Sequence, residues 1–407
     1  MQIDIRTLTK DELPEFMRTL EGAFGHDISD ENIERHVHVM DPDRMHGAFD
    51  GDALVGTAGV YPFTLTIPGA RVRAAGVTMV GVLPSHRRKG ILTRLMRIQM
   101  DDAHERGEPI AVLWASEDAI YQRFGYGMAS VQGQIDMDRD RAAFMRDSGP
   151  VGRVRLVGVD DAVKIFPTVY DRVCETTPGM YARSPEWWRY HRFRDPEESR
   201  RGGGPMWRAV LEIDGAPEAY ALYRVFSNWK GGLNTGHTHV EEAVGTSPVA
   251  TREIWRFLFG VDLMDRVKGW LLPPDHLLML SITEPTRLRF ARVDTFWLRV
   301  VDVKSALEAR GYRDDGTIVF DVTDGFCSWN EGRWRLEVRD GRGLVQRTGD
   351  EPDLLVDVAD LAPSYLGAFS FTQVMRAGRI VEATPGSAAR ADALFSTPFA
   401  PWCPEIF

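Results

Sequence analysis

Residues 77–92 of this 407-residue chain read VTMVGVLPSHRRKGIL. The segment 77–82 is apolar and rich in β-branched residues, which predicts a buried strand. After a short loop, apolar residues recur at helical spacing from Gly90 onward, which predicts a helix. The apolar run 110–115 predicts a second buried strand. Strand, helix and strand in this order indicate a right-handed βαβ unit with parallel strands.

The loop before the helix carries three adjacent cations, Arg87, Arg88 and Lys89, followed by Gly90. A helix N-terminus presents unpaired N–H groups and a partial positive charge, and a glycine lets a ligand approach the backbone closely. The loop therefore predicts a pyrophosphate-binding site. A basic loop that is only solvated is the alternative, because a short basic-glycine match is a weak signal by itself.

A second motif follows the strand at 110–115. Ser116-Glu117-Asp118 predicts an N-cap with acids in the first turn, and Gly125 is expected to end this short helix. Tyr121 lies between them. A phenol with an ordinary pKa of about 10 is protonated at neutral pH, so Tyr121 is a candidate general acid, with a core aromatic as the alternative.

These motifs resemble those of the GNAT superfamily of N-acetyltransferases, whose loop carries Arg or Gln, two residues, Gly, one residue, then Gly or Ala. Arg87 and Gly90 match this pattern, and Leu92 departs from it. The resemblance implies that the strand before the loop carries a bulge and separates from the next parallel strand, and that Tyr121 faces the cofactor sulfur. It implies an acetyl-CoA site made of Val80, Gly81, Val82, Arg87, Arg88, Lys89, Gly90, Ile91, Leu92, Thr93, Ser116 and Glu117.

The middle of the chain repeats the pattern of strand, helix and strand at 238–272. Ser247-Pro248 predicts an N-cap with proline at the first helical position, but the connection has no basic residues. We interpret this segment as a degenerate second copy of the same fold. The loop Arg200-Arg201-Gly202-Gly203-Gly204 predicts a flexible basic connector. The residues expected to fill the middle core are Trp187, Trp188 and Trp207.

The last ten residues, PFAPWCPEIF at 398–407, are unusual for a terminus because large apolar side chains and prolines dominate them. We expect this tail to dock into the protein. If it enters the cleft of the first domain, the α-carboxylate of Phe407 becomes an anion beside the reacting amine. Burial raises the pKa of a carboxylate, so through a water it would remove the ammonium proton as general base.

The whole chain, with RRKGIL at 87–92 and ASEDAIYQRFGYG at 115–127, resembles the Eis (enhanced intracellular survival) acetyltransferases, which tolerate a bulky residue at position 92. The resemblance implies a homo-hexamer that acetylates aminoglycosides at several amines, a route to antibiotic resistance, and some lysine side chains. It assigns the acid to Tyr121 and the base to the carboxylate of Phe407.

Acidic side chains bind the polycationic sugar in that family, and two candidates occur here. Asp27 lies in Phe24-Gly25-His26-Asp27, and Glu405 lies two residues before the end of the chain. Ordinary surface carboxylates are the alternative for both.

The fold class that follows is α+β (mixed α/β), with two GNAT-like domains, the second degenerate, and a C-terminal sterol-carrier-protein-like α+β domain that delivers the C-terminus. The expected boundaries are 1–147, 148–292 and 293–407. The third segment predicts strands at 298–303, 317–322 and 334–339 and helices at 358–365, 372–377 and 387–395.

Composition restricts the setting. The chain is 43% hydrophobic and 27% charged, as soluble globular proteins are, and its formal charge of -10 disfavours a nucleic-acid partner. No apolar run is long enough for a membrane span and no signal peptide opens the chain, so we expect a cytoplasmic protein without a membrane partner. The chain has three cysteines, Cys174, Cys327 and Cys403, and two closely spaced histidine pairs, His36/His38 and His237/His239. We expect no metal at any of them.

Three functions stay open at this point. The first is acetyl transfer from acetyl-CoA to amines of polyamine small molecules such as aminoglycosides. The second is a protein lysine or N-terminal acyltransferase resembling N-myristoyltransferases. The third is a non-catalytic module that binds acyl-CoA or lipid.

Overall fold

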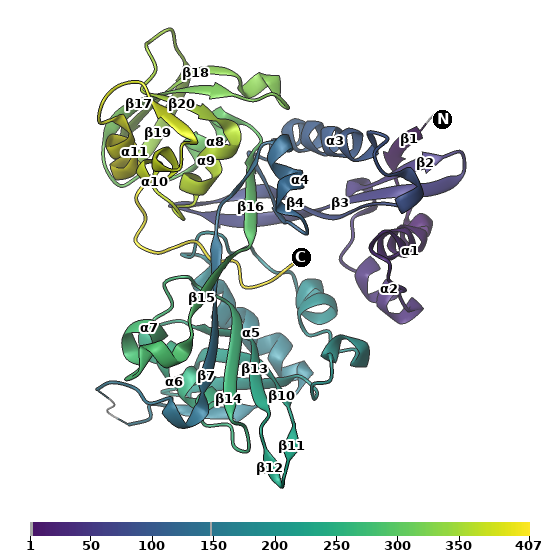
Figure 1. Cartoon of the computed structure of the whole chain (residues 1–407), viewed down its shortest axis with the longest axis vertical. Helices are drawn as coiled ribbons and strands as arrows, with labels where there is room; N and C mark the ends of the chain where they lie inside the picture. The colour runs from purple at the N-terminus through teal and green to yellow at the C-terminus, as the bar shows by residue number, and fades with distance from the viewer. Residues whose placement is uncertain (1–2, 147–148) are drawn as a thin grey trace. The chain divides into compact units, whose positions relative to one another are not determined.

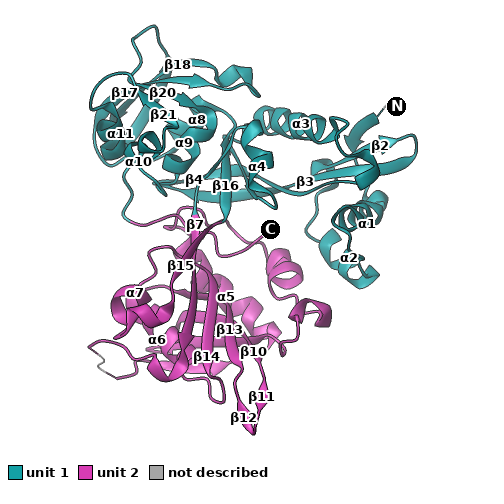
Figure 2. Cartoon of the chain, in the orientation of Figure 1, with its two compact units in different colours: residues 1–130, 295–398, 407 teal, residues 131–294, 399–406 magenta. Residues whose placement is uncertain are grey.

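The computed structural model of the chain (Figure 1) describes residues 3–146 and 149–407. It divides into two compact units, coloured separately in Figure 2. The first unit comprises residues 1–130, 295–398 and 407, and the second comprises residues 131–294 and 399–406.

The first unit contains a mixed sheet with strand order β1-β2-β3-β4-β5-β16-β6 (Figure 1). Its strands are β1 (Ile3–Thr7), β2 (Met45–Asp50), β3 (Ala53–Ile67), β4 (Ala70–Val82), β5 (Ile110–Trp114), β6 (Tyr126–Met128) and β16 (Phe296–Val300). The helices of this part are α1 (Leu13–Phe24), α2 (Asp30–Val37), α3 (Ile91–Glu105) and α4 (Asp118–Tyr121). β4 and β5 pair in parallel and α3 connects them, so the predicted βαβ unit is confirmed.

α3 packs on this sheet through one apolar face. Met96 and Met100 are fully buried in a cluster with Val60 of β3 and Val77 of β4. Burying a side chain of this size stabilises the fold by about 2 kcal/mol. An isolated helix of this length is only marginally stable in water, so this packing is what stabilises α3. The packing fixes the start of α3 relative to the end of β4.

The second unit contains a mixed sheet with strand order β15-β7-β14-β13-β10-β9-β8 and a hairpin of β11 and β12. Its strands are β7 (Val131–Asp138), β8 (Arg153–Leu156), β9 (Trp207–Ile213), β10 (Ala216–Phe226), β11 (Trp229–Lys230), β12 (Leu233–Asn234), β13 (His237–Gly245), β14 (Arg266–Leu272) and β15 (Ala291–Asp294). Its α-helices are α5 (Val159–Cys174), α6 (Pro248–Phe259) and α7 (Leu278–Ser281).

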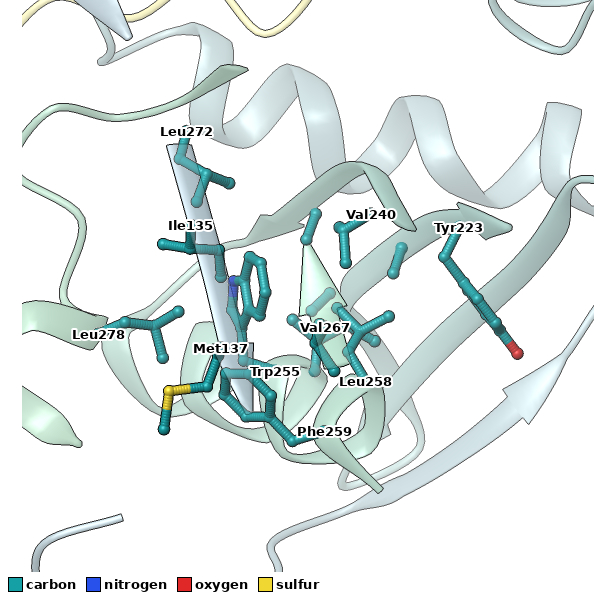
Figure 3. Close-up of a cluster of buried hydrophobic side chains, with 14 of the residues drawn as sticks. Ile135, Met137, Tyr223, Val240, Trp255, Leu258, Phe259, Val267, Leu272 and Leu278 are labelled. Atoms are coloured by element: carbon teal, nitrogen blue, oxygen red, sulfur yellow. The ribbon is translucent and has the colours of Figure 1, made fainter. Parts of the chain in front are cut away.

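The β13–α6–β14 segment confirms the predicted second copy. β13 and β14 pair in parallel, Ser247 caps α6 by accepting a hydrogen bond from the backbone N–H of Ala250, and Pro248 is the first helical residue. Figure 3 shows the core beneath it, where Trp255 and Leu258 of α6 lie against side chains of β7, β13 and β14.

The tryptophans of the second unit divide into two groups. Trp187 and Trp188 are buried, as predicted, and Trp188 packs with Tyr170 of α5 at 5.4 Å between ring centroids. The prediction for Trp207 is wrong, because its side chain is 43% exposed. Trp207 opens β9, and successive residues of a strand point to opposite faces, so one face of the strand end is left to solvent.

The sterol-carrier-like part of the first unit has a sheet of its own with strand order β19-β18-β17-β20-β21. Its strands are β17 (Gly316–Thr323), β18 (Gly332–Arg339), β19 (Arg342–Arg347), β20 (Leu354–Asp357) and β21 (Ile380–Glu382). Its helices are α8 (Val303–Ala309), α9 (Val358–Tyr365), α10 (Phe371–Arg376) and α11 (Ser387–Phe395), which confirms the three predicted helices. The strand predicted at 298–303 ends earlier, because the Asp302 carboxylate accepts from the Ser305 N–H and starts α8.

Two strands join sheets other than those of their sequence neighbours. β7 follows β6 directly but pairs with β14 and β15 in the second unit, whereas β16 pairs with β5 and β6 in the first. The predicted boundary at 147/148 lies outside the described residues. The division into folding domains at 1–147, 148–292 and 293–407 stays a prediction.

Within residues 3–146 and 149–407, none of the helices has the length and hydropathy needed to cross a membrane. The same residues contain no cluster of three or more His, Cys, Asp and Glu side chains suited to a metal ion. His36 lies in α2, so the pair His36/His38 is not extended, whereas His237 and His239 lie on β13. The three cysteines are buried and unbridged.

Candidate active site

A cavity of about 530 Å³ lies in the first unit, where β4 ends and α3 begins. The predicted residues that line it are Val80, Gly81, Val82, Arg87, Arg88, Gly90, Ile91, Leu92, Thr93, Ser116, Glu117 and Tyr121. Lys89 is not among the lining residues, and its Nζ donates to the Ser85 carbonyl at 2.9 Å. The lining residues that the sequence did not indicate are Ala23, Phe24, His86, Ile120 and Arg123.

β4 is distorted where it borders the cavity. Thr57 of β3 lies opposite Gly81 and Gly59 lies opposite Thr78, so β4 has one extra residue between these pairs. Met79 has a φ of 54°, and its carbonyl accepts from Thr57 Oγ1 at 2.9 Å. The bulge implied by the resemblance is confirmed.

The backbone of β4 beyond the bulge borders the cavity without a parallel partner. Within the described residues, the pairing of β4 with β5 stops at Gly76 and Val112. The backbone at 80–82 therefore lacks β5 as a partner, although Gly81 and Val82 still pair with β3 and the Val82 carbonyl accepts from Arg87 Nε. Backbone groups left without a strand partner here can bind a ligand. The separation of the two strands is confirmed.

Arg87 ties the loop to the body of the first unit. Its Nη2 donates to the Ala23 carbonyl at the end of α1 at 2.7 Å, and its Nε donates to the Val82 carbonyl at 3.2 Å. These bonds use the guanidinium group to fix the loop, so Arg87 holds the cavity wall and adds its charge there, although the residue is exposed.

The start of α3 is built to leave donors for a ligand. Gly90, the N-cap, has a φ of 77° and makes no side-chain hydrogen bond to the helix. The N–H groups of the first turn therefore lack capping partners, and the helix adds a partial positive charge at this end. Arg88 is exposed beside them at a φ of 62°. Phosphate groups fit this arrangement because N–H donors and a cation converge on one end of the cavity.

Tyr121 lies on α4 with 6% of its surface exposed. Its ring is 6.0 Å from that of Tyr126, edge to face, which fixes its orientation. Burial raises the pKa of Tyr121, and a hydrogen bond with the Ser116 hydroxyl partly opposes this shift. The phenol is therefore protonated at neutral pH.

The prediction that Ser116 caps α4 is wrong. The N-cap is Glu117, and no side chain caps this turn. The Ser116 hydroxyl bonds with Tyr121 instead, which is a direct contact between two predicted site residues. Gly125 ends the turn after Tyr121 at a φ of 82°, as predicted.

The C-terminal tail docks, as predicted, against residues that are far from it in the sequence. Trp402 is buried, its backbone N–H donates to the Pro178 carbonyl at 2.8 Å, and its Nε1 donates to the Leu271 carbonyl. Phe399 is 64% exposed, so docking involves only part of the apolar tail.

Glu405 is buried inside the second unit. Tyr181 Oη and Trp187 Nε1 each donate to its Oε2 at 2.9 Å. Arg183 Nε lies 2.9 Å from the same oxygen, and His191 Nδ1 lies 3.1 Å from Oε1. Burial alone would raise the pKa of Glu405, but Arg183, His191 and Arg192 together outweigh it and hold the pKa well below its usual range. This carboxylate anchors the tail.

Phe407 belongs to the first unit. Its ring packs edge-on against Phe63 of β3, with 4.8 Å between centroids, and lies 6.3 Å from Phe296 of β16. It is not among the residues that line the cavity. Asp27 is exposed in the loop between α1 and α2 and does not line the cavity either.

Comparison with protein families explains this arrangement. Residues 4–129 and 179–310 match models described as acetyltransferase (GNAT) domains, and residues 303–404 match a sterol carrier protein domain. The GNAT fold implies acetyl-CoA as co-substrate. The bulged strand and the uncapped start of α3 in this chain fit its pantetheine and pyrophosphate.

Relatives along the whole chain point the same way. A Streptomyces avermitilis protein described as an uncharacterised N-acetyltransferase is 40% identical over 100% of both chains. N-acetyltransferase Eis of Mycobacterium tuberculosis is 33% identical over 86% of this chain and 85% of its own. The crystal structure of Eis1 from Mycobacterium abscessus superposes with a TM-score of 0.85 at 33% identity, covering 99% and 100% of the two chains. The chain is therefore an acyltransferase that belongs to the Eis family of GNAT N-acetyltransferases.

Proposed function

We propose that this enzyme transfers the acetyl group of acetyl-CoA to amines of polyamine small molecules such as aminoglycosides, at more than one position. The observation that carries the proposal is the cavity of the first unit, where a bulged strand, an uncapped helix start and Tyr121 meet. Acetyl-CoA, when bound, supplies an activated acetyl thioester.

The residues proposed to hold the co-substrate act through their backbone and charge. The amides of Val80, Gly81 and Val82 would bind the pantetheine arm. The segment 88–93 would bind the pyrophosphate, with Arg88 supplying the cation. Arg87 would act mainly by holding the loop, because its guanidinium bonds to two backbone carbonyls.

Tyr121 is the proposed general acid. Its raised pKa keeps the phenol protonated, and Tyr121 lines the cavity, so its hydroxyl can donate a proton there. A proton from Tyr121 would neutralise the departing thiolate sulfur. Ser116 would hold the phenol in position for this step.

The carboxylate of Phe407 is the proposed general base, which would take the ammonium proton of the acceptor directly or through a water. The support is the packing found within each unit taken by itself. Glu405 is locked by buried partners, and the Phe407 ring is packed against Phe63. Asp27 is the proposed ligand of a cationic acceptor, whereas the partners of Glu405 favour an anchoring role for that residue.

The experiment is to measure thiol release from acetyl-CoA with an aminoglycoside for the untagged chain and for a version with one glycine after Phe407. The extension moves the carboxylate, so we expect turnover to fall by about 10²-fold or more with acetyl-CoA binding unchanged. Phe407→Leu is the matched control, because it keeps the terminal carboxylate and an apolar side chain, and it should retain most of the activity.

Equal turnover of the extended chain would remove Phe407 from the mechanism. Turnover with a lysine peptide or with long-chain acyl-CoA, but not with the aminoglycoside, would favour a protein acyltransferase. No turnover with any acceptor would favour an acyl-CoA or lipid carrier. The homo-hexamer and the cytoplasmic location are also proposals, and light scattering of the purified chain tests the first.

A further inference from the structure

The second unit has a cavity of its own, of about 440 Å³, which is within the size range of small-molecule sites. The chain carries a formal charge of -10, yet the charged side chains that line this cavity are mostly cationic. Its arginines are Arg192, Arg194, Arg200, Arg201 and Arg224. Such a local excess of positive charge in an acidic protein attracts anions.

The carboxylates near this cavity do not balance its arginines, because three of them are each shared by two arginines. Asp195 pairs with Arg200 at 3.0 Å and with Arg224 at 2.6 Å. Glu242 pairs with Arg192 at 3.1 Å and with Arg183 at 2.7 Å.

Glu405 is shared in the same way, by Arg183 and Arg192. Glu241 pairs with Arg224 at 3.0 Å. Burial lowers the pKa of the lining His239, so that ring adds no charge at neutral pH. The surplus positive charge therefore comes from guanidinium groups.

Arg201 is the arginine most open to a ligand. It lies in the basic Arg200–Gly204 connector, at a φ of 51°, and its side chain is exposed. The ion pairs that Asp195 makes with the neighbouring Arg200 and with Arg224 do not include it. The glycines that follow allow close packing here, since a Cβ at Gly203 would clash with the Phe226 ring. The connector is thus a wall of the cavity that presents a cation.

Aromatic rings form another wall. The His239 ring lies 6.1 Å from Phe226 and 6.3 Å from Trp270, measured between centroids. The buried Nε1 of Trp270 has no hydrogen-bond partner among the described residues. A buried donor without a protein partner costs free energy, and Trp270 is one of the residues that line the cavity. These rings suit a planar group with polar atoms at its edge.

The cavity lies where the parallel strands β13 and β14, neighbours in Figure 1, separate. Their pairing stops at Val240 and Gly269, and the next residues, Glu241 and Trp270, line the cavity. Clefts at the carboxyl ends of parallel strands are where open α/β sheets bind ligands.

We propose that this cavity binds a small organic phosphate that carries a planar ring, a ligand separate from acetyl-CoA and its acceptor. The guanidinium fork of Arg201 suits phosphate oxygens in geometry as well as in charge, the other arginines add positive charge around it, and the rings receive the planar group. The site uses side chains, whereas the cavity of the first unit uses backbone donors at a helix start.

The test is a calorimetric titration of the full chain, saturated with coenzyme A to fill the first cavity, using adenosine 5′-monophosphate as the probe. We expect binding that weakens as salt is raised. Arg201→Gln should weaken it by about tenfold, because it removes one charged contact. Arg153→Gln, an equal charge change on the exposed β8, should leave it unchanged.

Two further probes test the ring and the phosphate. Ribose 5-phosphate should bind more weakly than the nucleotide, and adenosine should bind more weakly still. Phe226→Leu should bring the affinities for adenosine 5′-monophosphate and ribose 5-phosphate closer together, because it removes an aromatic wall of the cavity. The proposal is overturned if coenzyme A abolishes nucleotide binding. It is also overturned if Arg88→Gln weakens nucleotide binding while Arg201→Gln does not. A third contrary outcome is that citrate displaces the nucleotide from the Arg201→Gln variant as readily as from the original chain.

Discussion

The two GNAT-like parts of this chain share a β–α–β arrangement and differ at the start of the connecting helix. In the first unit, α3 begins at Ile91, and its N-cap residue Gly90 has no side chain to cap it. In the second unit, Ser247 accepts a hydrogen bond from the Ala250 N–H, and Pro248 has no N–H to offer. The first helix therefore keeps its donors for a ligand, whereas the second satisfies them internally.

Other features survive in both copies. β13 shifts register against β10 between Leu222 and Tyr223, just as β4 shifts against β3, and β13 also separates from β14. Topology thus provides a cleft in each unit. What fills the start of the helix decides whether backbone donors or side chains recognise the ligand, so fold and function separate at a handful of residues.

The largest expected effect is on the chemistry assigned to the first unit. Tyr121→Phe removes the proposed proton donor and should lower kcat by about 10²-fold or more, with little change in acetyl-CoA binding. If the acetyl donor is instead a thioester of a much more acidic thiol, its thiolate leaves without protonation. With that donor, the kcat of Tyr121→Phe should fall far less. Steady-state kinetics with the two donors measure the difference.

Tyr126→Phe is the matched control for this prediction. The Tyr126 hydroxyl is buried with no hydrogen-bond partner among the described residues, so its removal should leave kcat unchanged and stability equal or higher. If Tyr121→Phe loses activity equally with acetyl-CoA and with the more acidic thioester, Tyr121 only packs and does not donate a proton.

The next effect tests the second unit as the holder of the tail. Arg183→Met leaves the carboxylates of Glu242 and Glu405 buried without their main partner, which should cost about 3–5 kcal/mol. Urea unfolding of the full chain measures the cost. Arg172→Met breaks a similar two-bond pair with Glu218 that is half exposed, and should cost less than about 1 kcal/mol. Similar costs for the two variants would contradict the anchoring role.

The uncapped start of α3 is tested by Gly90→Ala. A side chain at a φ of 77° costs about 1–2 kcal/mol, so the loop should rearrange and weaken coenzyme A binding several-fold. Gly90→Asn should bind better than Gly90→Ala, because asparagine tolerates this conformation. Gly215→Ala, at a φ of 81° in the turn between β9 and β10, carries the same strain and should bind coenzyme A normally. Titration of coenzyme A distinguishes loop geometry from general strain.

Much of this architecture could be predicted because its signals are local. Apolar periodicity at 77–115 indicated the parallel strands and their helix, and Ser247-Pro248 indicated a capped helix start. The cofactor residues are contiguous in sequence, so naming the loop named most of the cavity lining. The bulge came from the resemblance to the family.

What the sequence missed depends on residues far apart in the chain. The partners of Glu405 begin at Tyr181, more than two hundred positions earlier, and nothing near Glu405 marks it as buried. The pairing of β16 with β5 and β6 depends on the packing of the whole unit. Arg87 lines the cavity as predicted, and its role in binding the co-substrate stays a prediction, but its bonds to Ala23 and Val82 appear only when α1 meets the loop.

The smallest effect concerns the capped helix of the second unit. Ser247→Ala removes the hydrogen bond to Ala250 and should destabilise the chain by about 1 kcal/mol, whereas Ser247→Gly should cost only a few tenths. Neither change should alter coenzyme A binding, because α6 has no cationic loop before it. Urea unfolding and coenzyme A titration on the same samples check both parts. A loss of coenzyme A affinity in Ser247→Ala would mean that the second copy takes part in binding the co-substrate, and the contrast between the two helix starts would then no longer explain where the co-substrate binds.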